Sequence, residues 1–325
     1  MQATNTLLWF VDNNSTIAAR QVLEAAGVRV ETTYSQRDRV PYSEGILQKE
    51  KNAVRIILFP TTSATSPEAQ ELAKVANHLF LTGGLAGRPG QVKLGDVVAV
   101  AGCYHIDLGA DRKMDGAVIH NFSPLFATAE VQATLRKLQF EQLQLEETLP
   151  VALHTRRNWV LDYLMHAEKA LPMQELFRIA TDETADGETK NLQWKKTVLF
   201  LREMGFLTVE NRQVELTEKG REHCGKYPPE TYEAPTNQIR VKLANIITSS
   251  HTHAELEGSE DWIKFDKGEF SPLGLDTDSY DMLRLYPKIT ILKAVSNFGA
   301  GDKGDKKDVI QKAAAVACMH LIQGI

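Results

Sequence analysis

Near the C-terminal end of this 325-residue chain, two carboxylates separated by one residue stand before a predicted short helix. They are Asp276 and Asp278, and the apolar strand predicted over 289–298 ends in Ser296 and Asn297. Ligand sites in α/β proteins form just outside the carboxyl ends of strands, and a carboxylate accepts hydrogen bonds from hydroxyl groups. The segment therefore predicts a pocket for a ligand that carries hydroxyl groups.

A glycine-rich stretch earlier in the chain adds to this predicted pocket. A strand is predicted over 79–82, and Gly83-Gly84-Leu85-Ala86-Gly87 follows it. This pattern predicts a turn whose backbone N–H groups approach an anion closely. We expect Gly84 and Gly87 to contact substrate. Arg88, directly after the turn, either holds a phosphate or is a solvated surface arginine.

Two further polar residues follow predicted strands. Asp12 comes directly after the apolar run 6–11 and is the acid nearest to the first strand. His105 lies beyond the apolar strand predicted over 92–100, and it either lines the pocket or is a buried structural histidine. Both residues therefore belong to the candidate site by their position along the chain.

The elements that must position these residues alternate along the first 150 residues. Apolar runs predict strands over 6–11, 28–32, 54–59, 79–82 and 92–100, and helical spacing predicts helices over 16–26 and from Pro67 onwards. Strands that alternate with helices indicate an α/β domain with a largely parallel sheet. The same pattern resumes after residue 239.

Residues 151–226 have a different pattern. Helices are predicted over 156–168, 171–177 and 191–204, a loop over 181–190, and two short strands over 206–209 and 214–217. Three helices and a hairpin resemble a winged helix, and the alternative is a helical lid of unrelated fold. The segment 227–234 is typical of a linker. Residues 1–150 and 235–325 are therefore predicted to form one discontinuous domain.

Several motifs in this order resemble the nucleoside phosphorylase and nucleosidase superfamily. They are Gly84-Leu85-Ala86-Gly87, Leu94-Gly95-Asp96-Val97-Val98, Asp276-Thr277-Asp278-Ser279 and Ser296-Asn297, followed by the charged loop Gly301-Asp302-Lys303. The resemblance covers residues 1–150 and 235–325. It implies a central mixed sheet flanked by helices, with the winged helix inserted, and an assembly of several copies of the chain.

The resemblance also implies cleavage of the N-glycosidic bond of a purine nucleoside or nucleotide, without a metal or cofactor, by water or by phosphate as a co-substrate. Asp278 then accepts hydrogen bonds from the ribose hydroxyls beside Asp276, and Asn297 contacts the base. Many hydrolytic members of the family carry a glutamate shortly after the first strand to activate water, and Asp12 is the acid of this chain nearest to that position. An amide at Asn297 cannot protonate the base, so part of the ~10²–10⁴-fold typical of general acid catalysis is lost. Asp278 could instead cap a helix, and Asn297 could satisfy loop backbone groups.

The middle segment carries a predicted basic face. Lys190, Lys195, Lys196 and Arg202 lie on or beside its third predicted helix, which indicates contact with DNA, RNA or a protein partner. Acidic residues slightly outnumber basic ones over the whole segment, whereas a strong DNA-binding protein normally has a basic excess. Both kinds of partner therefore stay open.

Composition is ordinary for a soluble globular protein, with 43% hydrophobic and 24% charged residues and a net charge of −5. No apolar run approaches the ~20 residues of a spanning helix, so we expect a cytoplasmic protein without membrane contact. Three cysteines without close spacing predict neither a disulfide framework nor a metal site. The leading hypothesis is a nucleosidase or phosphorylase, with nucleotide depletion in a bacterial antiphage defence or toxin system, gated by the winged helix, as one setting. The alternative is a nucleoside-sensing regulator that binds DNA.

Overall fold

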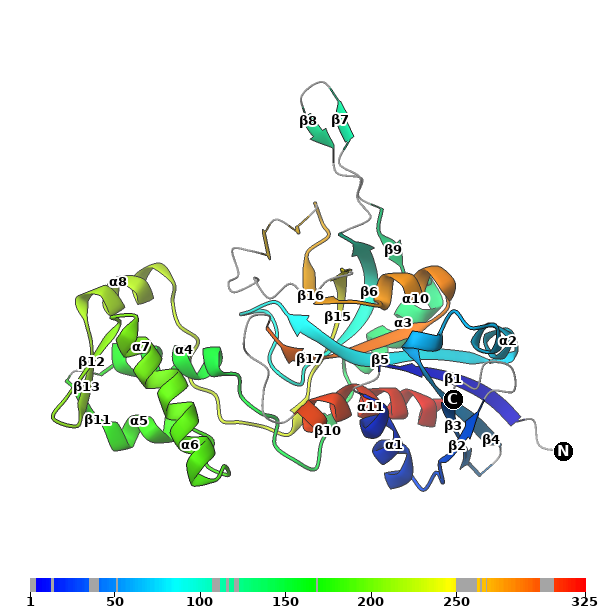
Figure 1. The fold of residues 1–325 in the computed structure, drawn as a ribbon, viewed down its shortest axis with the longest axis horizontal. Coiled ribbons are helices and arrows are strands. Elements are labelled where there is room, and N and C mark those ends of the chain that lie inside the picture. The colour runs from blue at the N-terminus through cyan, green and yellow to red at the C-terminus, as the bar shows by residue number, and fades with distance from the viewer. Residues whose placement is uncertain are drawn as a thin grey trace. The chain divides into compact units, whose positions relative to one another are not determined.

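The structure is a computed structural model (Figure 1). It describes residues 4–12, 15–34, 41–50, 52–106, 112–114, 117–119, 123–167, 169–249, 262–263, 265–266, 268–298 and 307–325. The predicted charged loop Gly301-Asp302-Lys303 lies outside these residues. The chain divides into two compact units, residues 1–150 with 237–325 and residues 151–236, which are called unit 1 and unit 2.

Unit 1 is built on a mixed sheet. Its strands are β1 (Thr4–Val11), β2 (Glu31–Tyr34), β3 (Pro41–Gln48), β4 (Ala53–Pro60), β5 (His78–Gly87), β6 (Val97–His105), β9 (Leu125–Phe126), β15 (Val241–Thr248), β16 (Pro272–Asp276) and β17 (Thr290–Asn297). Their order is β16-β15-β6-β17-β5-β1-β4-β3-β2, and β9 pairs with β6. Parallel pairs such as β1–β4 and antiparallel pairs such as β3–β4 both occur. The predicted α/β class with a central mixed sheet is confirmed, although the sheet is less parallel than the alternation suggested.

Five of these strands pair with one another in a closed ring. β16 pairs in parallel with β15 and antiparallel with β5, where Gly274 lies opposite Gly87 and Leu275 opposite Ala86. Because β15 also pairs with β6, β6 with β17 and β17 with β5, the pairing forms a ring. Side chains of strands that are not neighbours can then meet across the interior of the ring.

The middle of the sheet is apolar on both faces. In β1, Leu7, Leu8, Trp9 and Phe10 are all 0% exposed, which is typical of strands covered on both sides. Helices α1 (Thr16–Ala25) and α11 (Lys307–Gly324) lie together below the sheet in Figure 1, and α10 (Ser279–Leu285) lies above it. Unit 1 also contains α2 (Pro67–Val75), α3 (Ala129–Leu138) and the separate hairpin of β7 (Arg112–Met114) and β8 (Ala117–Ile119).

Unit 2 has its own core. Its elements are α4 (Leu153–Met165), β11 (Leu171–Pro172), α5 (Met173–Ala180), α6 (Gly187–Trp194), a π-helical turn (Lys195–Leu199), α7 (Phe200–Glu203), β12 (Leu207–Glu210), β13 (Gln213–Leu216) and α8 (Glu218–Lys226). The strands form a sheet in the order β11-β13-β12. Trp159, Leu176 and Val198 belong to a buried apolar cluster that lies wholly within this unit. Its assignment as a winged helix stays a prediction.

The chain leaves unit 1 and returns to it through adjacent strands. These are β10 (Leu143–Gln144) and β14 (Gln238–Ile239), which pair antiparallel. Leu145 N–H donates to the Asn237 carbonyl at 2.9 Å, and the Asn237 side-chain amide donates to the Leu145 carbonyl, also at 2.9 Å. Unit 2 therefore begins and ends at neighbouring points of unit 1.

Several element predictions differ from the structure: the strands predicted over 28–32 and 92–100 correspond to β2 and β6, which begin at Glu31 and Val97. Residues 83–87 continue β5 and do not form a turn, because β17 pairs with them as far as Ala86. β3 was not predicted, since polar residues and Gly45 interrupt its apolar pattern. α6 begins at Gly187, inside the predicted loop 181–190, because the Asp186 carboxylate caps it by accepting from Thr189 N–H at 2.8 Å. In the described part of the chain, no helix is both long enough and apolar enough to cross a membrane.

Candidate active site

A buried lysine lies among the predicted acids. The Lys293 side chain, in β17, is 1% exposed, and its Nζ lies 2.5 Å from Asp278 Oδ1 and 3.2 Å from Asp276 Oδ2. An ammonium group removed from water needs such partners, because an unpaired buried charge is strongly unfavourable. β16 and β17 are not neighbours in the ring. The contact between them therefore spans its interior.

Asp12 approaches the same lysine from β1. Lys293 is paired with Gly83 of β5, and Asp12 directly follows β1, the strand on the other side of β5. Asp12 Oδ2 accepts a hydrogen bond from Gly84 N–H at 2.8 Å, and its Oδ1 accepts one from Ser15 N–H at 2.8 Å. Two backbone donors therefore orient this carboxylate.

The glycines of β5 make room for the charged side chains. A Cβ at Gly83 would lie 2.4 Å from Asp12 Oδ2 and 2.9 Å from Lys293 Nζ, and a Cβ at Gly84 would lie 2.9 Å from Ser296 Oγ. The N–H of Gly84 is bonded to a carboxylate of the chain itself. The prediction of an anion-binding turn here is therefore wrong, because the strand continues and Asp12 occupies the donor.

Asp276 is fixed by hydroxyl groups as well as by Lys293. Thr248 Oγ1 donates to Asp276 Oδ1 at 2.8 Å, and Ser279 Oγ donates to its Oδ2. Burial opposes the ionised form, but the charge of Lys293 and these hydrogen bonds outweigh it, so the pKa of Asp276 lies below its ordinary value. Asp276 is therefore a permanent anion at neutral pH.

The pKa of Asp278 is shifted in the opposite direction from that of Asp276. It occupies the N-cap position of α10, but its side chain makes no capping hydrogen bond and bonds Lys293 instead. Burial, opposed by the charge of Lys293 and reinforced by that of Asp276, raises the pKa of Asp278 to about 7. Its side chain is 21% exposed, against 2% for Asp276. Of the two acids, Asp278 is the one open to a ligand.

The carboxylates keep the lysine charged. Burial acts to lower the pKa of Lys293, but the charges of Asp278, Asp276 and Asp12 raise it above its ordinary value. Among the described residues the cluster thus combines three carboxyl groups with one ammonium group. We call these four residues the acid–lysine cluster. Because its carboxyl groups outnumber its ammonium group, the cluster can stabilise a positive charge that develops on a bound ligand.

Ser296 and Asn297 continue β17 beyond the cluster. Ser296 Oγ donates to the Leu85 carbonyl at 3.2 Å and lies within 3.2 Å of Asn297 Nδ2, which donates to it. Gly84 lies between Ser296 and Asp12: its N–H donates to Asp12, and a Cβ on it would meet Ser296 Oγ. The structure therefore places Asp12 beside Gly84 through a hydrogen bond, and Ser296 beside Gly84 through close packing. Contact of Asn297 with a base stays a prediction.

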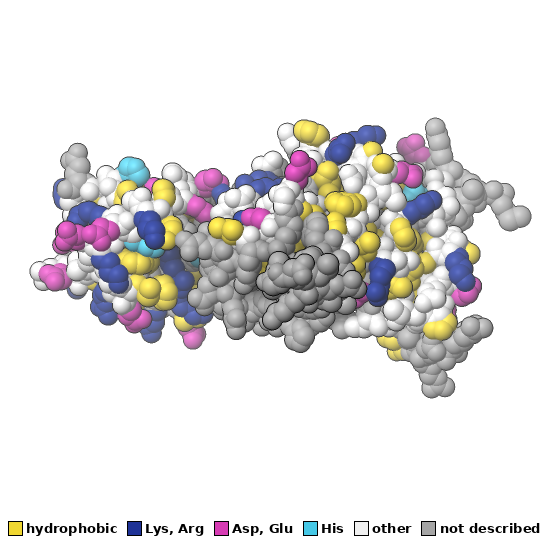
Figure 2. Space-filling view, turned by 90° about the horizontal axis from the view of Figure 1, so that it is seen from above, with side chains coloured by type: hydrophobic (Ala, Val, Ile, Leu, Met, Phe, Trp, Pro, Cys, Tyr) yellow, Lys and Arg dark blue, Asp and Glu magenta, His cyan; other side chains and the backbone are white. Residues whose placement is uncertain are grey.

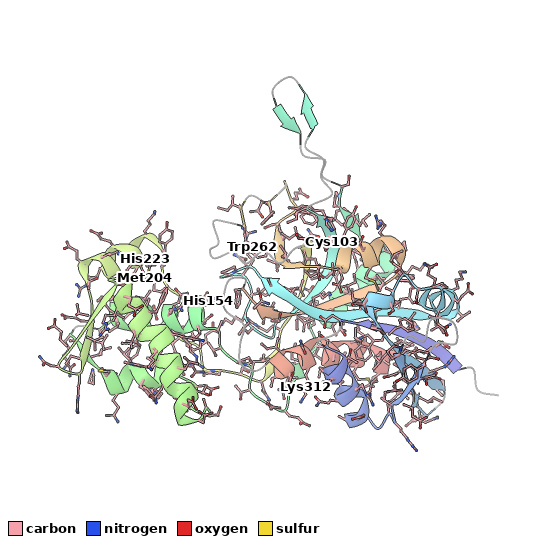
Figure 3. All side chains as sticks on the ribbon, in the orientation of Figure 1. Cys103, His154, Met204, His223, Trp262 and Lys312 are labelled. Atoms are coloured by element: carbon pink, nitrogen blue, oxygen red, sulfur yellow. The ribbon has the colours of Figure 1, made fainter. Side chains whose placement is uncertain are left out.

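His105 lies one strand away from Asp276. Thr248 of β15 is paired with His105 on one side and with Asp276 on the other, and the His105 ring lies 5.7 Å from the Tyr280 ring. His105 is 9% exposed. Cys103, labelled in Figure 3, has its Sγ 3.1 Å from Thr248 Oγ1, and burial raises the pKa of its thiol well above the ordinary value. These contacts favour a structural role for both residues.

Two predicted substrate contacts lie outside the cluster. A Cβ at Gly87 would meet Val295 Cγ1 and Val92 Cγ2 at 2.6 Å each, so this glycine serves apolar packing. The Arg88 guanidinium is bound to the Asp266 carboxylate at 2.8 and 3.1 Å. A bidentate partner already satisfies this arginine, which argues against its predicted role as a phosphate ligand.

Lys293, Gly83 and Thr248 were not predicted as site residues. Lys293 interrupts the apolar strand Ile289–Val295, and a lone charge in a buried strand requires buried partners of opposite charge. That signal is present in the sequence. Thr248 carries no comparable signal, because its role depends on the pairing of β15 with β16. Among the described residues, no group of His, Cys, Asp and Glu side chains is arranged to hold a metal ion.

The predicted basic residues of unit 2 are mostly exposed. Lys195, Lys196 and Arg202 are exposed, whereas Lys190 is half-buried and donates to the Glu183 carbonyl at 2.8 Å. On the face drawn in Figure 2, basic and acidic side chains are interspersed over this unit, at the left of the view. Their contact with a nucleic acid or a protein stays a prediction.

No protein-family model and no curated protein matches the chain, but solved structures share its fold. A futalosine hydrolase of Helicobacter pylori has a TM-score of 0.50 at 8% identity, covering 99% of this chain and 98% of that one. A mutant 5′-methylthioadenosine/S-adenosylhomocysteine nucleosidase of the same species, with 5′-methylthioadenosine in its active site, has a TM-score of 0.50 at 9% identity over 100% of both chains. A putative nucleosidase of this kind from Francisella philomiragia has a TM-score of 0.50 at 10% identity, covering 99% of this chain and 100% of that one. At such low identity the likeness is one of fold: this chain has the fold of these nucleosidases.

Proposed function

We propose that this protein cleaves the N-glycosidic bond of a purine nucleoside. The observation that carries the proposal is the acid–lysine cluster, in which Asp12, Asp276 and Asp278 meet a buried Lys293. The acids stand at the carboxyl ends of β1 and β16, where ligands bind in α/β sheets. Support also comes from the solved structures of the same fold, which include a nucleosidase with 5′-methylthioadenosine in its active site.

The charges of the cluster suit the reaction. When the bond between C1′ and the base nitrogen breaks, its electron pair leaves with the base, and positive charge develops on the sugar. Carboxylates that are held in place before the reaction stabilise that charge. Asp278, the more exposed acid, accepts from the ribose hydroxyls. Asp12 orients the oxygen nucleophile that attacks C1′, and the base takes up a proton.

Lys293 sets how much charge the acids carry. It keeps Asp276 ionised, because its charge opposes the effect of burial on the pKa of that carboxyl group. Asp278, with a pKa raised to about 7, changes its charge near neutral pH. The cluster thus contains one permanent anion and one acid that both accepts and donates hydrogen bonds at the ribose.

Release of free base from purine nucleosides tests the proposal. The protein is incubated with adenosine, inosine and 5′-methylthioadenosine, with and without phosphate, and the base is measured by chromatography. We expect release by the wild type and a loss of at least about 10²-fold in Asp278→Ala, because a preorganised charge is removed from the transition state. Asp281→Ala is the matched control, since Asp281 is half-exposed on α10 and pairs with Arg284.

A nucleoside-sensing regulator is the second candidate. It is favoured by Asn297, whose amide cannot protonate a leaving base and already donates to Ser296. Nucleoside binding without any release of base, measured by calorimetry in the same samples, would support this alternative. A role in antiphage defence, the partners of unit 2 and the number of copies in an assembly stay predictions.

A further inference from the structure

Arg88 joins two parts of unit 1. Its Nη1 donates to Asp266 Oδ1 at 2.8 Å and its Nη2 donates to Asp266 Oδ2 at 3.1 Å. Nη1 also donates to Ser271 Oγ at 3.0 Å, and this hydroxyl donates to Asp266 Oδ1 at 3.0 Å. The hydrogen bonds from Arg88 lower the pKa of Asp266, so this carboxyl group is ionised at neutral pH.

This ion pair lies beside the pairing of β5 with β16 that closes the five-strand ring, which is called the seam. β5 and β16 are paired at two positions, and Arg88 N–H adds one bond to the Leu273 carbonyl at 2.8 Å. The strands approach so closely that a Cβ at Gly274 would lie 2.4 Å from Leu85 Cδ1. A pairing of this length is weak by itself. The charge-assisted bonds between Arg88 and Asp266 extend it.

The seam supports the acids directly. Asp276 is the last residue of β16, and Asp278 follows two positions later. The neighbouring residue Leu275 belongs to an apolar cluster that includes Phe265, the residue before Asp266. The other members of that cluster are Tyr104, Ile247, Trp262 and Phe270. Arg88 therefore connects the end of β5 to β16 through the Leu273 carbonyl, and to the residues that precede β16 through Ser271 and Asp266.

We propose that Arg88 and Asp266 are positioning residues for the reaction, and that their ion pair holds β16 in the place where Asp276 and Asp278 reach Lys293. The inference rests on the proposed cleavage of an N-glycosidic bond. It gives Arg88 a role in the geometry of the acids. Phosphate binding by the same guanidinium would require Asp266 to leave it.

The test compares two broken ion pairs of the same kind. Arg88→Met and Asp266→Asn break the pair at the seam. Arg55→Met breaks a bidentate pair with Glu44, at 2.7 and 3.0 Å, between β3 and β4, which are outside the ring. We expect kcat to fall about 10²-fold in the seam variants, because acids displaced by about 1 Å no longer fit the transition state. Arg55→Met should keep the wild-type kcat, although its melting temperature should decrease about as much as that of the seam variants. The exchanged pair Arg88→Asp with Asp266→Arg should recover most of the activity.

A second readout does not require catalysis. Hydrogen exchange of the backbone amides over 272–278 should become faster in Arg88→Met and stay unchanged in Arg55→Met. Unchanged exchange, or an unchanged kcat in both seam variants, overturns the positioning role. A third outcome would also overturn the positioning role. If base release depends on phosphate in the wild type, and Arg88→Met loses only this dependence, then Arg88 binds phosphate. If the wild type releases no base while exchange responds as expected, the proposed function fails and the positioning of β16 by Arg88 stands.

Discussion

At the scale of single residues, Lys293 has the largest expected effect on this fold. Its ammonium group contacts Asp276 and Asp278 in an interior where neither the lysine nor Asp276 reaches solvent. Breaking a buried ion pair from one side leaves an uncompensated charge, whereas surface pairs contribute little. The stability of unit 1 therefore depends on a group that the proposed reaction also needs.

Replacing Lys293 with methionine tests this dependence. We expect Lys293→Met to lower the free energy of unfolding by about 3–5 kcal/mol, since buried carboxyl groups lose their partner. The measurement is urea unfolding followed by circular dichroism. Lys74→Met is the control, because Lys74 pairs with Glu71 on the surface of α2 with 69% and 68% of the two side chains exposed. Equal stability of the two variants would contradict the role of Lys293.

The raised pKa of Asp278 predicts how stability changes with pH. Between the unfolded value near 4 and the folded value of about 7, the folded state binds more protons than the unfolded state. Stability should therefore decrease as the pH rises through this window, by roughly 2 kcal/mol between pH 5 and 8. Urea unfolding at both pH values measures it. Asp278→Asn should remove most of the decrease, and an equal decrease in that variant would assign it to another group.

At the scale of elements, β5 connects the acid–lysine cluster to the rest of the ring. It pairs with β1, β17 and β16. Charged or polar side chains approach its Gly83 and Gly84, whereas the valines Val92 and Val295 pack against its Gly87. Glycine usually weakens a strand interior, and it often marks a close approach of another group. The glycine-rich composition of residues 83–87 is therefore explained by the site and by the closure of the ring.

Gly83→Ala tests this explanation. The added Cβ would meet Asp12 Oδ2 and Lys293 Nζ, so we expect a loss of about 1–3 kcal/mol in stability and a strong loss of base release. Gly225→Ala in α8 is the control, because a Cβ there meets no atom within 4 Å; it should keep its activity and gain up to about 1 kcal/mol. Full activity of Gly83→Ala would show that the cluster tolerates displacement.

At the scale of the whole molecule, unit 2 has a core of its own and is joined to unit 1 through paired strands. Because Leu145 and Asn237 are already bonded to one another within unit 1, the removal of unit 2 leaves two chain ends that a short linker can join. The fold of unit 1 should therefore not depend on unit 2.

Deletion of residues 151–236, with a Gly-Ser linker in their place, tests this independence. We expect unit 1 to unfold cooperatively on heating and to retain base release, and residues 151–236 expressed alone to fold as well. Calorimetry and a chromatographic assay measure both. A folded deletion variant without activity would show that unit 2 takes part in catalysis. An unfolded one would show that the two units form one cooperative structure.

Much of the fold and part of the site follow from local patterns. The apolar runs of β1, β4 and β17 predict buried strands wherever they occur, because their side chains leave water whatever lies beside them. Asp276, Asp278, Ser296 and Asn297 stand at the ends of such strands, so their candidacy could be predicted from the sequence. Lys293 could have been identified in the same way, from a charge inside an apolar run.

Local patterns of the sequence thus identify which segments are buried and which polar residues stand at their ends. Which of these residues become partners depends on how the strands pair in three dimensions. Arg88 binds Asp266 rather than an external anion, and Gly84 donates to Asp12. The physical reason is that these contacts depend on strand register and on the closure of a ring between residues more than 70 positions apart. No spacing within a single segment encodes them.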